Sequence, residues 1–263
     1  MSAFGHHVIM RLVSSQVLAR TPEARRRAAR ILLEEGRRGL LAFRLADTHA
    51  HALLICTRRE AGRFANYVEQ RLRWHLQLPS PFEPANIRLV HTQSHLERAF
   101  SYVLRQEEHH GIALDPRHEA SSAQDLLGLR VVAPDFLPRV QSALPRLRVG
   151  ELTDGLALER CEPDFDHLAD SPAPAFALPW LDPSAHAAAA RAAAVHAAAE
   201  LSAGQIAERL AVTRRCVERL RRQPVPTGLV RAVRMQLTVR PRGRDSWSGA
   251  CPDPDLMRPD WAG

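Results

Sequence analysis

Residues 40–56, LLAFRLADTHAHALLIC, are the stretch from which we predict the fold. The runs 40–46 and 50–57 are short and apolar, which is typical of two neighbouring strands. Successive side chains of a strand alternate between its two faces, so His49 and His51 point the same way. The stretch therefore presents two imidazoles on one face of a predicted sheet.

Further strands and helices are predicted on both sides of this pair. In chain order they are a strand at 7–13, a helix at 21–39, a helix at 59–78, a strand at 86–91 and a helix at 94–106. With the strand pair they give the order β-α-β-β-α-β-α, which is a ferredoxin-like split βαβ order with an extra helix. We therefore predict an α+β fold in which an antiparallel sheet carries helices packed on one face.

Two of these helices have recognisable ends. Thr21 is expected as the N-cap of the first helix, with Pro22 in its first position and Gly39 as its stop. Ser94, followed three residues later by Glu97, has the pattern of a capping box and is expected to cap the last helix.

Tyr102 and Gln106 lie four residues apart in the predicted helix 94–106, so they share one face of it. Imidazoles and a carboxamide oxygen suit a divalent cation with coordination positions left open for a phosphate. A tyrosine hydroxyl beside that phosphate can attack phosphorus, form a phosphotyrosine and release a 3′-hydroxyl. His49, His51, Tyr102 and Gln106 are therefore candidates for one metal-assisted phosphoryl-transfer site.

Each of these signals also has a simpler interpretation. An H-x-H pattern on a strand often consists of partly buried or surface histidines, and Tyr102 also suits the packing of an amphipathic helix. Tyr67, the only other tyrosine, is interpreted as a packing residue. His6 and His7 are interpreted as flanking the first strand without a chemical role.

The chain is basic, and its charge is unevenly distributed. The net charge is +7, and all 36 residues of the Lys+Arg total are arginines. Residues 1–130 carry +6, residues 131–183 carry −5 and residues 201–244 carry +9. Two basic blocks separated by an acidic spacer indicate two surfaces for a polyanion, although solvated arginine-rich helices would give the same charges.

A helix-turn-helix pattern follows an alanine-rich helix at 184–200. In LSAGQIAERLAVTRRCVERLRRQ (201–223), Ala207, Ala211 and Val217 occupy the small, turn and core positions. The side chains expected to face the major groove or its phosphates are those of Thr213, Arg214, Arg215 and Arg219. The alternative is a plain α-hairpin that packs on the first domain.

These patterns divide the chain into four parts. We predict a first domain at 1–130, a proline-rich and acidic linker or packing arm at 131–183, a small all-α helix-turn-helix domain at 184–240 and a disordered tail at 241–263.

Nothing in the sequence indicates a membrane segment or a disulfide framework. The most apolar stretch, 50–56, is far shorter than the about 20 residues of a membrane helix, and no apolar signal region follows the start. The four cysteines are widely separated and contain no C-x-x-C pair, so we interpret them as reduced thiols. We expect a soluble cytoplasmic protein, associated with the nucleoid, that is a monomer or a homodimer.

Several of these segments resemble those of a known family. LLAFRLADTHAHALLIC is similar to the strand-turn-strand segment of the HUH single-tyrosine transposases, particularly the REP-associated tyrosine transposases. Residues 7–11, HVIMR, resemble the opening strand of that family, and residues 100–106, FSYVLRQ, resemble its tyrosine helix. Residues 119–128, EASSAQDLLG, look like the Ser-Ser segment that follows. The resemblance covers roughly the first half of the chain.

The resemblance implies specific roles. His49 and His51 would bind Mg²⁺ or Mn²⁺, Gln106 would be the third protein ligand and Tyr102 the nucleophile. It also implies a transposase-like single-strand endonuclease and strand transferase that forms a covalent 5′-phosphotyrosine. The first domain would act on single-stranded or hairpin DNA, and the helix-turn-helix domain would bind duplex DNA.

Two alternatives stay open. The sequence departs from the family at Thr48, at Ala50 and at residues 106–108, QEE, and residues 78–91 lack the usual basic aromatic stretch. These departures favour a non-catalytic DNA-binding regulator derived from such a transposase. A hydrolytic metallonuclease is the second alternative, and it would form no covalent adduct.

Overall fold

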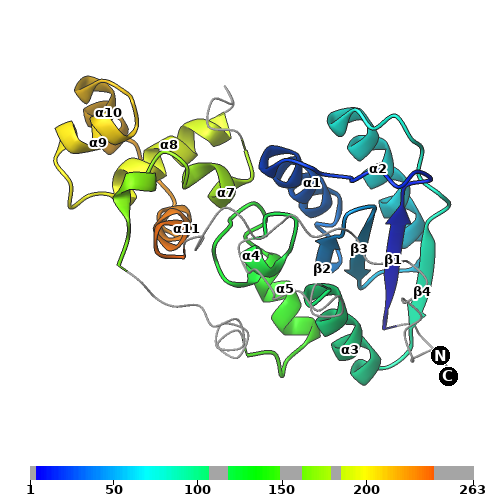
Figure 1. Cartoon of the computed structure of the whole chain (residues 1–263). Coiled ribbons are helices and arrows are strands. Elements are labelled where there is room, and N and C mark those ends of the chain that lie inside the picture. The colour runs from blue at the N-terminus through cyan, green and yellow to red at the C-terminus, as the bar shows by residue number, and fades with distance from the viewer. Residues whose placement is uncertain (1–3, 107–117, 149–161, 179–184, 240–263) are drawn as a thin grey trace.

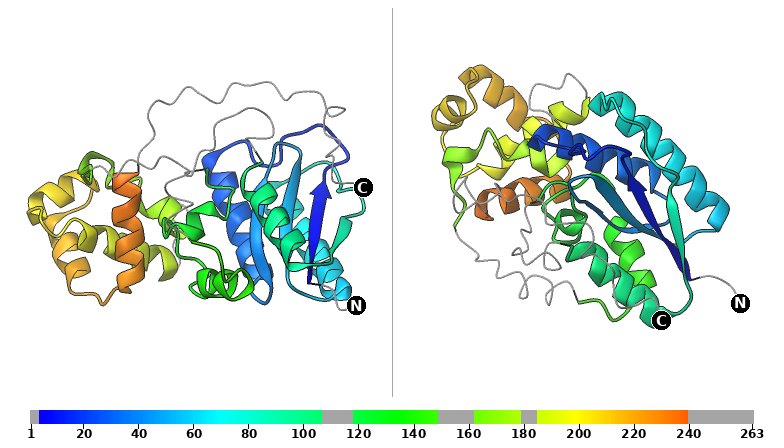
Figure 2. Two further views of the ribbon diagram at one scale, coloured as in Figure 1. Left: turned by 90° about the horizontal axis from the view of Figure 1, so that it is seen from below. Right: turned by 45° about the vertical axis from the view of Figure 1, so that its right-hand side comes forward.

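The computed structural model describes residues 4–106, 118–148, 162–178 and 185–239. This part of the chain is a mixed α+β protein with a four-stranded sheet at one end and a group of helices at the other (Figure 1). Both views in Figure 2 show the same division into a sheet-containing half and a helical half. The predicted tail at 241–263 lies outside the described residues.

The sheet is antiparallel at every neighbouring pair of strands, as predicted. In spatial order the strands are β2 (Leu40–Leu45), β3 (His49–Leu54), β1 (Gly5–Arg11) and β4 (Asn86–Val90). Strand β3 is buried along its whole length, and so is β2. His49 and His51 therefore lie inside the protein and not on its surface.

Two helices cover one face of the sheet. They are α1 (Pro22–Glu35) and α2 (Arg58–Leu76), which pack on each other. Ile87 of β4 faces α2, since its Cδ1 atom lies 4.0 Å from the position that a Cβ on Gly62 would take. Ala52 and Ile87 are both register partners of Val8, so all three side chains share this face.

A third helix, α3 (Gln93–Leu104), covers the opposite face. His51 precedes Ala52 and so points away from α2, and its ring contacts the ring of Tyr102 on α3. The expectation that helices pack on one face only is therefore wrong. The reason is that α3 has its own apolar side to bury, formed by Leu96, Ala99, Phe100, Val103 and Leu104.

Helix α1 begins as predicted and ends earlier. The Thr21 side chain accepts a hydrogen bond from the backbone N–H of Ala24 at 3.1 Å, and Pro22 is the first helical residue. The helix ends at Glu35 with Gly36 as its C-cap, so Gly39 is not the stop. A glycine is required at position 39 for a different reason, because a Cβ there would clash with the carbonyl oxygen of Ile55.

Helix α3 differs from the prediction at both ends. Thr92, not Ser94, is its N-cap: Thr92 has extended backbone angles, and its Oγ1 accepts from the N–H of His95 at 3.1 Å. Ser94 is already the second helical residue. The helix ends at Leu104, so Gln106 lies just beyond it and not on it.

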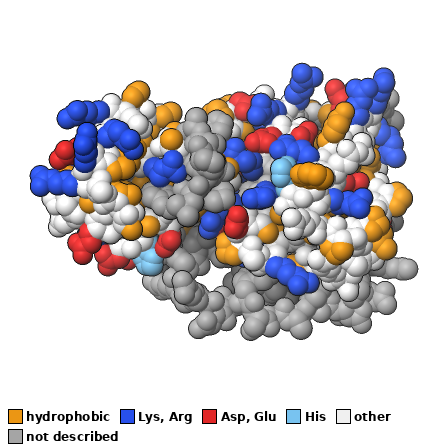
Figure 3. Space-filling model, turned by 90° about the horizontal axis from the view of Figure 1, so that it is seen from above, with side chains coloured by type: hydrophobic (Ala, Val, Ile, Leu, Met, Phe, Trp, Pro, Cys, Tyr) orange, Lys and Arg blue, Asp and Glu red, His pale blue; other side chains and the backbone are white. Residues whose placement is uncertain are grey.

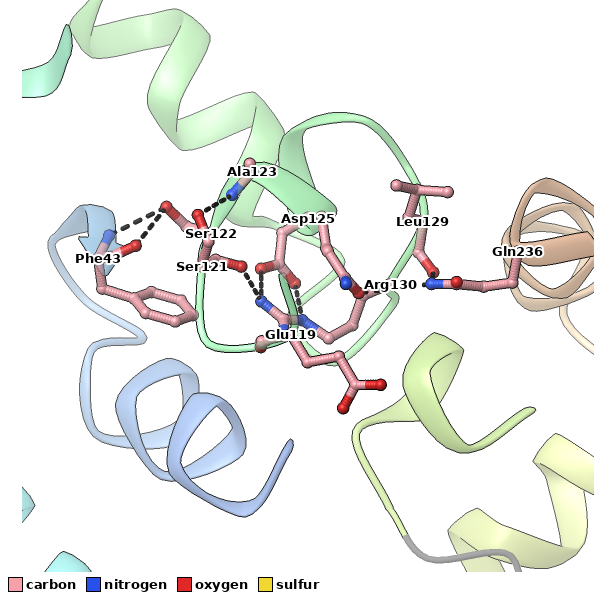
Figure 4. Close-up of polar contacts among 10 residues, drawn as sticks. Phe43, Glu119, Ser121, Ser122, Ala123, Asp125, Leu129, Arg130 and Gln236 are labelled. Atoms are coloured by element: carbon pink, nitrogen blue, oxygen red, sulfur yellow. Dashed lines mark hydrogen bonds and ion pairs between the residues drawn. The ribbon is translucent and has the colours of Figure 1, made fainter. Parts of the chain in front are cut away.

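The Ser-Ser segment covers the outer edge of β2 (Figure 4). The Oγ of Ser122 accepts from the N–H of Phe43 at 3.0 Å, and the N–H of Ser122 donates to the carbonyl oxygen of Phe43 at 3.0 Å. The N–H of Leu45 donates to the carbonyl oxygen of Ala120 at 2.9 Å. These bonds satisfy backbone groups that an open strand edge would leave unpaired.

Arg130 fixes this segment from within. Its guanidinium donates to both carboxylate oxygens of Asp125, at 3.0 and 2.5 Å, and to the carbonyl oxygens of Glu119 and Ser121, at 2.6 Å each (Figure 4). The side chains of Arg130 and Asp125 are 0% and 3% exposed. A short helix, α4 (Ala123–Leu126), is formed inside this loop.

The helical half has a second apolar core. Its elements are η2 (Phe165–His167), α7 (Pro172–Phe176), α8 (Ala185–Ala197), α9 (Ala203–Arg209), α10 (Arg214–Arg221) and α11 (Thr227–Thr238). Segment 131–183 contributes to both cores. Phe136 and Val140, on α5 (Phe136–Ala143), belong to the first core, while Leu168 and Ala175 belong to the second.

Hydrogen bonds join the two halves. Arg30 of α1 donates to the carbonyl oxygen of Phe176 at 2.6 Å, and the N–H of Val131 donates to that of Ala175 at 2.9 Å. From α11, the Nε2 of Gln236 donates to the carbonyl oxygen of Leu129 at 2.8 Å (Figure 4).

The turn between α9 and α10 is tight. Ala211 adopts a left-handed conformation with φ of 51°, a region that favours glycine. Ile206, Leu210, Val217 and Leu220 on either side of the turn are buried in the second core. Among the described residues, no helix combines the length and apolarity needed to cross a membrane.

Arg130→Met is expected to lower the free energy of unfolding by about 3–5 kcal/mol, because it leaves the Asp125 carboxylate buried without its cation. Urea unfolding measures the change, and Arg146→Met, at an exposed arginine beyond α5, is the control. An effect of Arg130→Met no larger than that of the control would contradict the role assigned to this ion pair.

Glu69 of α2 is expected to make stability depend on pH. One of its carboxylate oxygens is buried without a hydrogen-bond partner among the described residues, and burial raises the pKa of Glu69 from 4.5 to about 7. Between pH 4.5 and about pH 7, Glu69 binds more protons in the folded protein than in the unfolded chain. The free energy of unfolding therefore falls as the pH rises through this range.

Glu69→Gln should therefore raise the free energy of unfolding at pH 8 by about 1 kcal/mol, a figure reduced for partial exposure, and by much less at pH 5. Urea unfolding at the two pH values checks this, with Glu83→Gln at an exposed position as the control. An equal gain at both pH values would rule out the carboxylate charge as the cause.

Candidate active site

Strands β1 and β3 bring three histidines together. The register places Ile9 opposite His51, and the Nε2 atom of His7 lies 3.0 Å from the Nδ1 atom of His51. The two rings are stacked, with centroids 5.2 Å apart. The ring of His49 meets that of His51 edge-on at 4.7 Å. All three imidazoles are buried.

Tyr102 reaches the same group from α3. Its ring centroid lies 5.7 Å from that of His51 and 5.9 Å from that of His7, in both cases edge-on. Its side chain is half-buried, so one part of it is open to solvent. The structure thus brings the predicted nucleophile to the predicted imidazole pair.

Gln106 and His51 each carry a buried polar atom without a hydrogen-bond partner among the described residues. These atoms are the Oε1 of Gln106 and the Nε2 of His51. The Gln106 side chain is only 3% exposed, although it lies beyond the end of α3. Unpaired buried polar atoms are costly, and atoms of these two kinds are ligands for a divalent cation.

The electrostatics keep the imidazoles neutral. Burial, assisted by Arg88, lowers the pKa of His7 to about 4. Burial, assisted by His49 and His7, holds the pKa of His51 well below its usual range. Neutral imidazole is the form that binds a metal. At neutral pH both rings are therefore in the ligating state.

The hydrogen bond between His7 and His51 decides which nitrogen of His51 is available. When His51 donates from Nδ1 to the Nε2 of His7, its own Nε2 keeps a lone pair. Metal-bound histidines commonly make such a bond through the other ring nitrogen, which fixes the tautomer and the ring orientation. His49 has a weaker neighbour of this kind, since its Nδ1 lies 3.4 Å from the Oγ1 of Thr48.

His7 was missed by the sequence analysis, which gave it no chemical role. The structure places His7 inside the candidate site, because it is 4% exposed and contacts both His51 and Tyr102. Arg44 was also missed. It is the register partner of His51 on β2 and is 2% exposed, and its charge helps to lower the pKa of the buried His118. Alternation along each strand gives the face of these residues but not their partner across the sheet.

The donor set is smaller than that of a closed metal site. Among the described residues, no group of three or more His, Cys, Asp and Glu side chains is placed to hold a metal ion. The predicted set contains two imidazoles and one carboxamide, and two of its atoms, His51 Nε2 and Gln106 Oε1, are among the buried polar atoms without a hydrogen-bond partner in the described part of the chain. These residues suit a cation held by few protein ligands, with its remaining positions open to substrate oxygens.

The second group of predicted site residues lies on α10, far along the chain. Thr213 is the N-cap of this helix, and its Oγ1 accepts from the N–H of Cys216 at 3.2 Å. Arg214 lies 3.4 Å from Glu218, while Arg215 and Arg219 are exposed. Arginines gather at the end of the molecule formed by α9 and α10 (Figure 3). Thr213 therefore has a structural task at the start of α10, and its contact with DNA stays a prediction.

The fold and the candidate site were compared with known proteins. The chain matches no protein-family model, no curated protein and no solved structure in these searches.

Proposed function

We propose that the protein is a single-tyrosine DNA strand-cleaving and strand-joining enzyme, similar to the HUH transposases. The observation that carries the proposal is the pair of buried, unpartnered atoms, His51 Nε2 and Gln106 Oε1, in a site that contains Tyr102. The strand order β2-β3-β1-β4 with β-α-β-β-α-β connections supports it, because this is the order of a ferredoxin-like sheet.

In this proposal His49, His51 and Gln106 would hold Mg²⁺ or Mn²⁺. The cation, when bound, would polarise the non-bridging oxygens of the scissile phosphate. His7 would position His51 by accepting a hydrogen bond from its Nδ1–H, and this hydrogen bond would keep the ring from rotating.

Tyr102 would be the catalytic residue. Its oxygen forms a bond to phosphorus while the bond from phosphorus to the 3′-oxygen breaks, and the phenolic proton ends on the released 3′-hydroxyl. The product is a 5′-phosphotyrosine, in which the energy of the phosphodiester is conserved. Attack of another 3′-hydroxyl on that phosphorus reverses the step and joins two strands.

The helical half would bind duplex DNA as a helix-turn-helix domain. Helices α9 and α10 flank a tight turn at Ala211, and Arg215 and Arg219 of α10 point to solvent. Thr213 and Arg214, at the start of α10, lie where a recognition helix meets base edges or phosphates.

A non-catalytic DNA-binding regulator is the second candidate. It is favoured by the small donor set of the site and by the two glutamates that follow Gln106 in the sequence. In such a protein the buried imidazoles would be a relic of an ancestral metal site.

Tyr102→Phe tests the catalytic proposal. With Mn²⁺ and a folded single-stranded oligonucleotide, we expect the parent protein to form a covalent adduct that survives a denaturing gel. We expect Tyr102→Phe to form no adduct, since no oxygen remains to attack, while the neighbouring exposed Ser101→Ala forms as much as the parent.

Cleavage without an adduct would identify a hydrolytic metallonuclease instead. Absence of both cleavage and Mn²⁺ binding, with identical titrations for the parent and for His51→Ala, would favour the regulator.

Arg215→Ala/Arg219→Ala tests the duplex-binding proposal. We expect the double variant to bind duplex DNA at least about tenfold more weakly, because each lost phosphate or base contact removes roughly 1 kcal/mol or more. The slope of log K against log salt should fall by about 1–2. Fluorescence anisotropy measures both. Arg231→Ala, at an exposed arginine on α11, is the control that removes one charge, and an equal loss of affinity per arginine removed would refute a specific role for α10.

A further inference from the structure

Helix α2 exposes two large aromatic side chains. Trp74 is 82% exposed and Tyr67 is 53% exposed, so the interpretation of Tyr67 as a packing residue is wrong. Tryptophan is highly buried on average, and tyrosine and tryptophan are enriched at binding surfaces. Figure 2 shows α2 along the outside of the sheet-containing half.

The two rings belong to a continuous surface. Residues 63, 67, 70 and 74 are spaced i, i+4, i+7 and i+11, which places them in one row along a helix. We call this row and its exposed neighbours the α2 stripe, which consists of Arg59, Arg63, Asn66, Tyr67, Gln70, Arg73 and Trp74.

The α2 stripe is positively charged. In the described part of the chain, no carboxylate forms an ion pair with Arg59, Arg63 or Arg73. Arg71, on the side of α2 that faces α1, is by contrast bonded to Glu34 and Glu35 at 2.8 Å each. Arg71 is thus neutralised by α1, whereas on the stripe the charge of Arg63 acts on Glu60 without an ion pair, and Arg59 and Arg73 form no ion pair with a described carboxylate.

The other polar groups of the stripe complete a surface suited to nucleotides. The Nε2 of Gln70 donates to the Oδ1 of Asn66 at 3.0 Å, so these two amides are held to each other on the stripe. Glu60, the acidic residue in the first turn of α2, is hydrogen-bonded to Thr57 in a capping box. Amides, guanidinium groups and unstacked rings are the groups that bind bases and phosphates of single strands.

We propose that the α2 stripe binds single-stranded nucleic acid. Tyr67 and Trp74 would stack on bases, and Arg63 and Arg73 would contact the phosphates on either side. Single strands are the fitting occupant because a duplex offers no free base faces to the two rings. An uncharged protein partner would leave the arginines without counter-charges.

This site is separate from the one that contains Tyr102. Ile87 faces α2 across the sheet, and His51 and Tyr102 lie on the opposite face. The inference consequently does not depend on catalysis by Tyr102, and it is tested without any divalent ion.

Binding of fluorescein-labelled oligo-dT to the full-length protein tests the proposal by anisotropy. We expect Trp74→Ala to weaken binding by about five- to a hundredfold and Trp74→Phe to weaken it by less, since phenylalanine keeps a stacking ring. Arg63→Ala/Arg73→Ala should reduce the salt slope by about 1.4. Arg20→Ala, at an exposed arginine before α1, is the control and should bind as the parent does.

Intrinsic fluorescence gives a second readout, because stacking on a base quenches tryptophan emission. Of the four tryptophans of the chain, Trp74 is the one that lies within the described residues. We expect oligo-dT to quench the parent protein and to quench Trp74→Phe less. Unchanged affinity and salt slope in the stripe variants would overturn the proposal. So would a change of oligomeric state in Trp74→Ala without a change in affinity, because the stripe would then be an interface between copies of the chain.

Discussion

The antiparallel pairing of β1 with β3 is the constraint on which the candidate site depends. It places Ile9 opposite His51 and so brings His7 and His51 to the same face, 3.0 Å apart. A slip of β3 by one residue in this register would turn His49 and His51 to the side of α2 and away from His7. The register is well defined because the alternate face is filled by Val8, Met10 and Ala52, all with no exposed surface.

Burial on this face has two effects that act together. It removes water from the imidazoles, which lowers the pKa of His7 and His51 and keeps both rings neutral. It also leaves the Nε2 of His51 and the Oε1 of Gln106 without partners among the described residues. A neutral ligand atom that is buried without a hydrogen-bond partner lowers the stability of the fold, and a bound cation would offset part of this loss.

The local patterns of the sequence were enough to predict the strands and most helices, because apolar spacing and the Thr21 cap depend on neighbouring residues only. Distant contacts could not be predicted in this way. The position of His7 beside His51 follows from a register across 44 residues, and that of α3 from the need to bury a second sheet face. The choice of Thr92 over Ser94 as a cap depended on where the backbone leaves β4, which composition does not specify.

The sheet order also limits how a single strand can reach the site. Ala120–Ser122 covers the edge of β2, whereas β4, at the other edge, has no strand beside it among the described residues. Strand β4 lies between α2 and α3 in the chain, and its edge separates the α2 stripe from the Tyr102 face. A single strand of nucleic acid that is held on the α2 stripe and cut at Tyr102 would therefore pass round the edge of β4. The spacing between the two surfaces would then set the shortest single strand that occupies both.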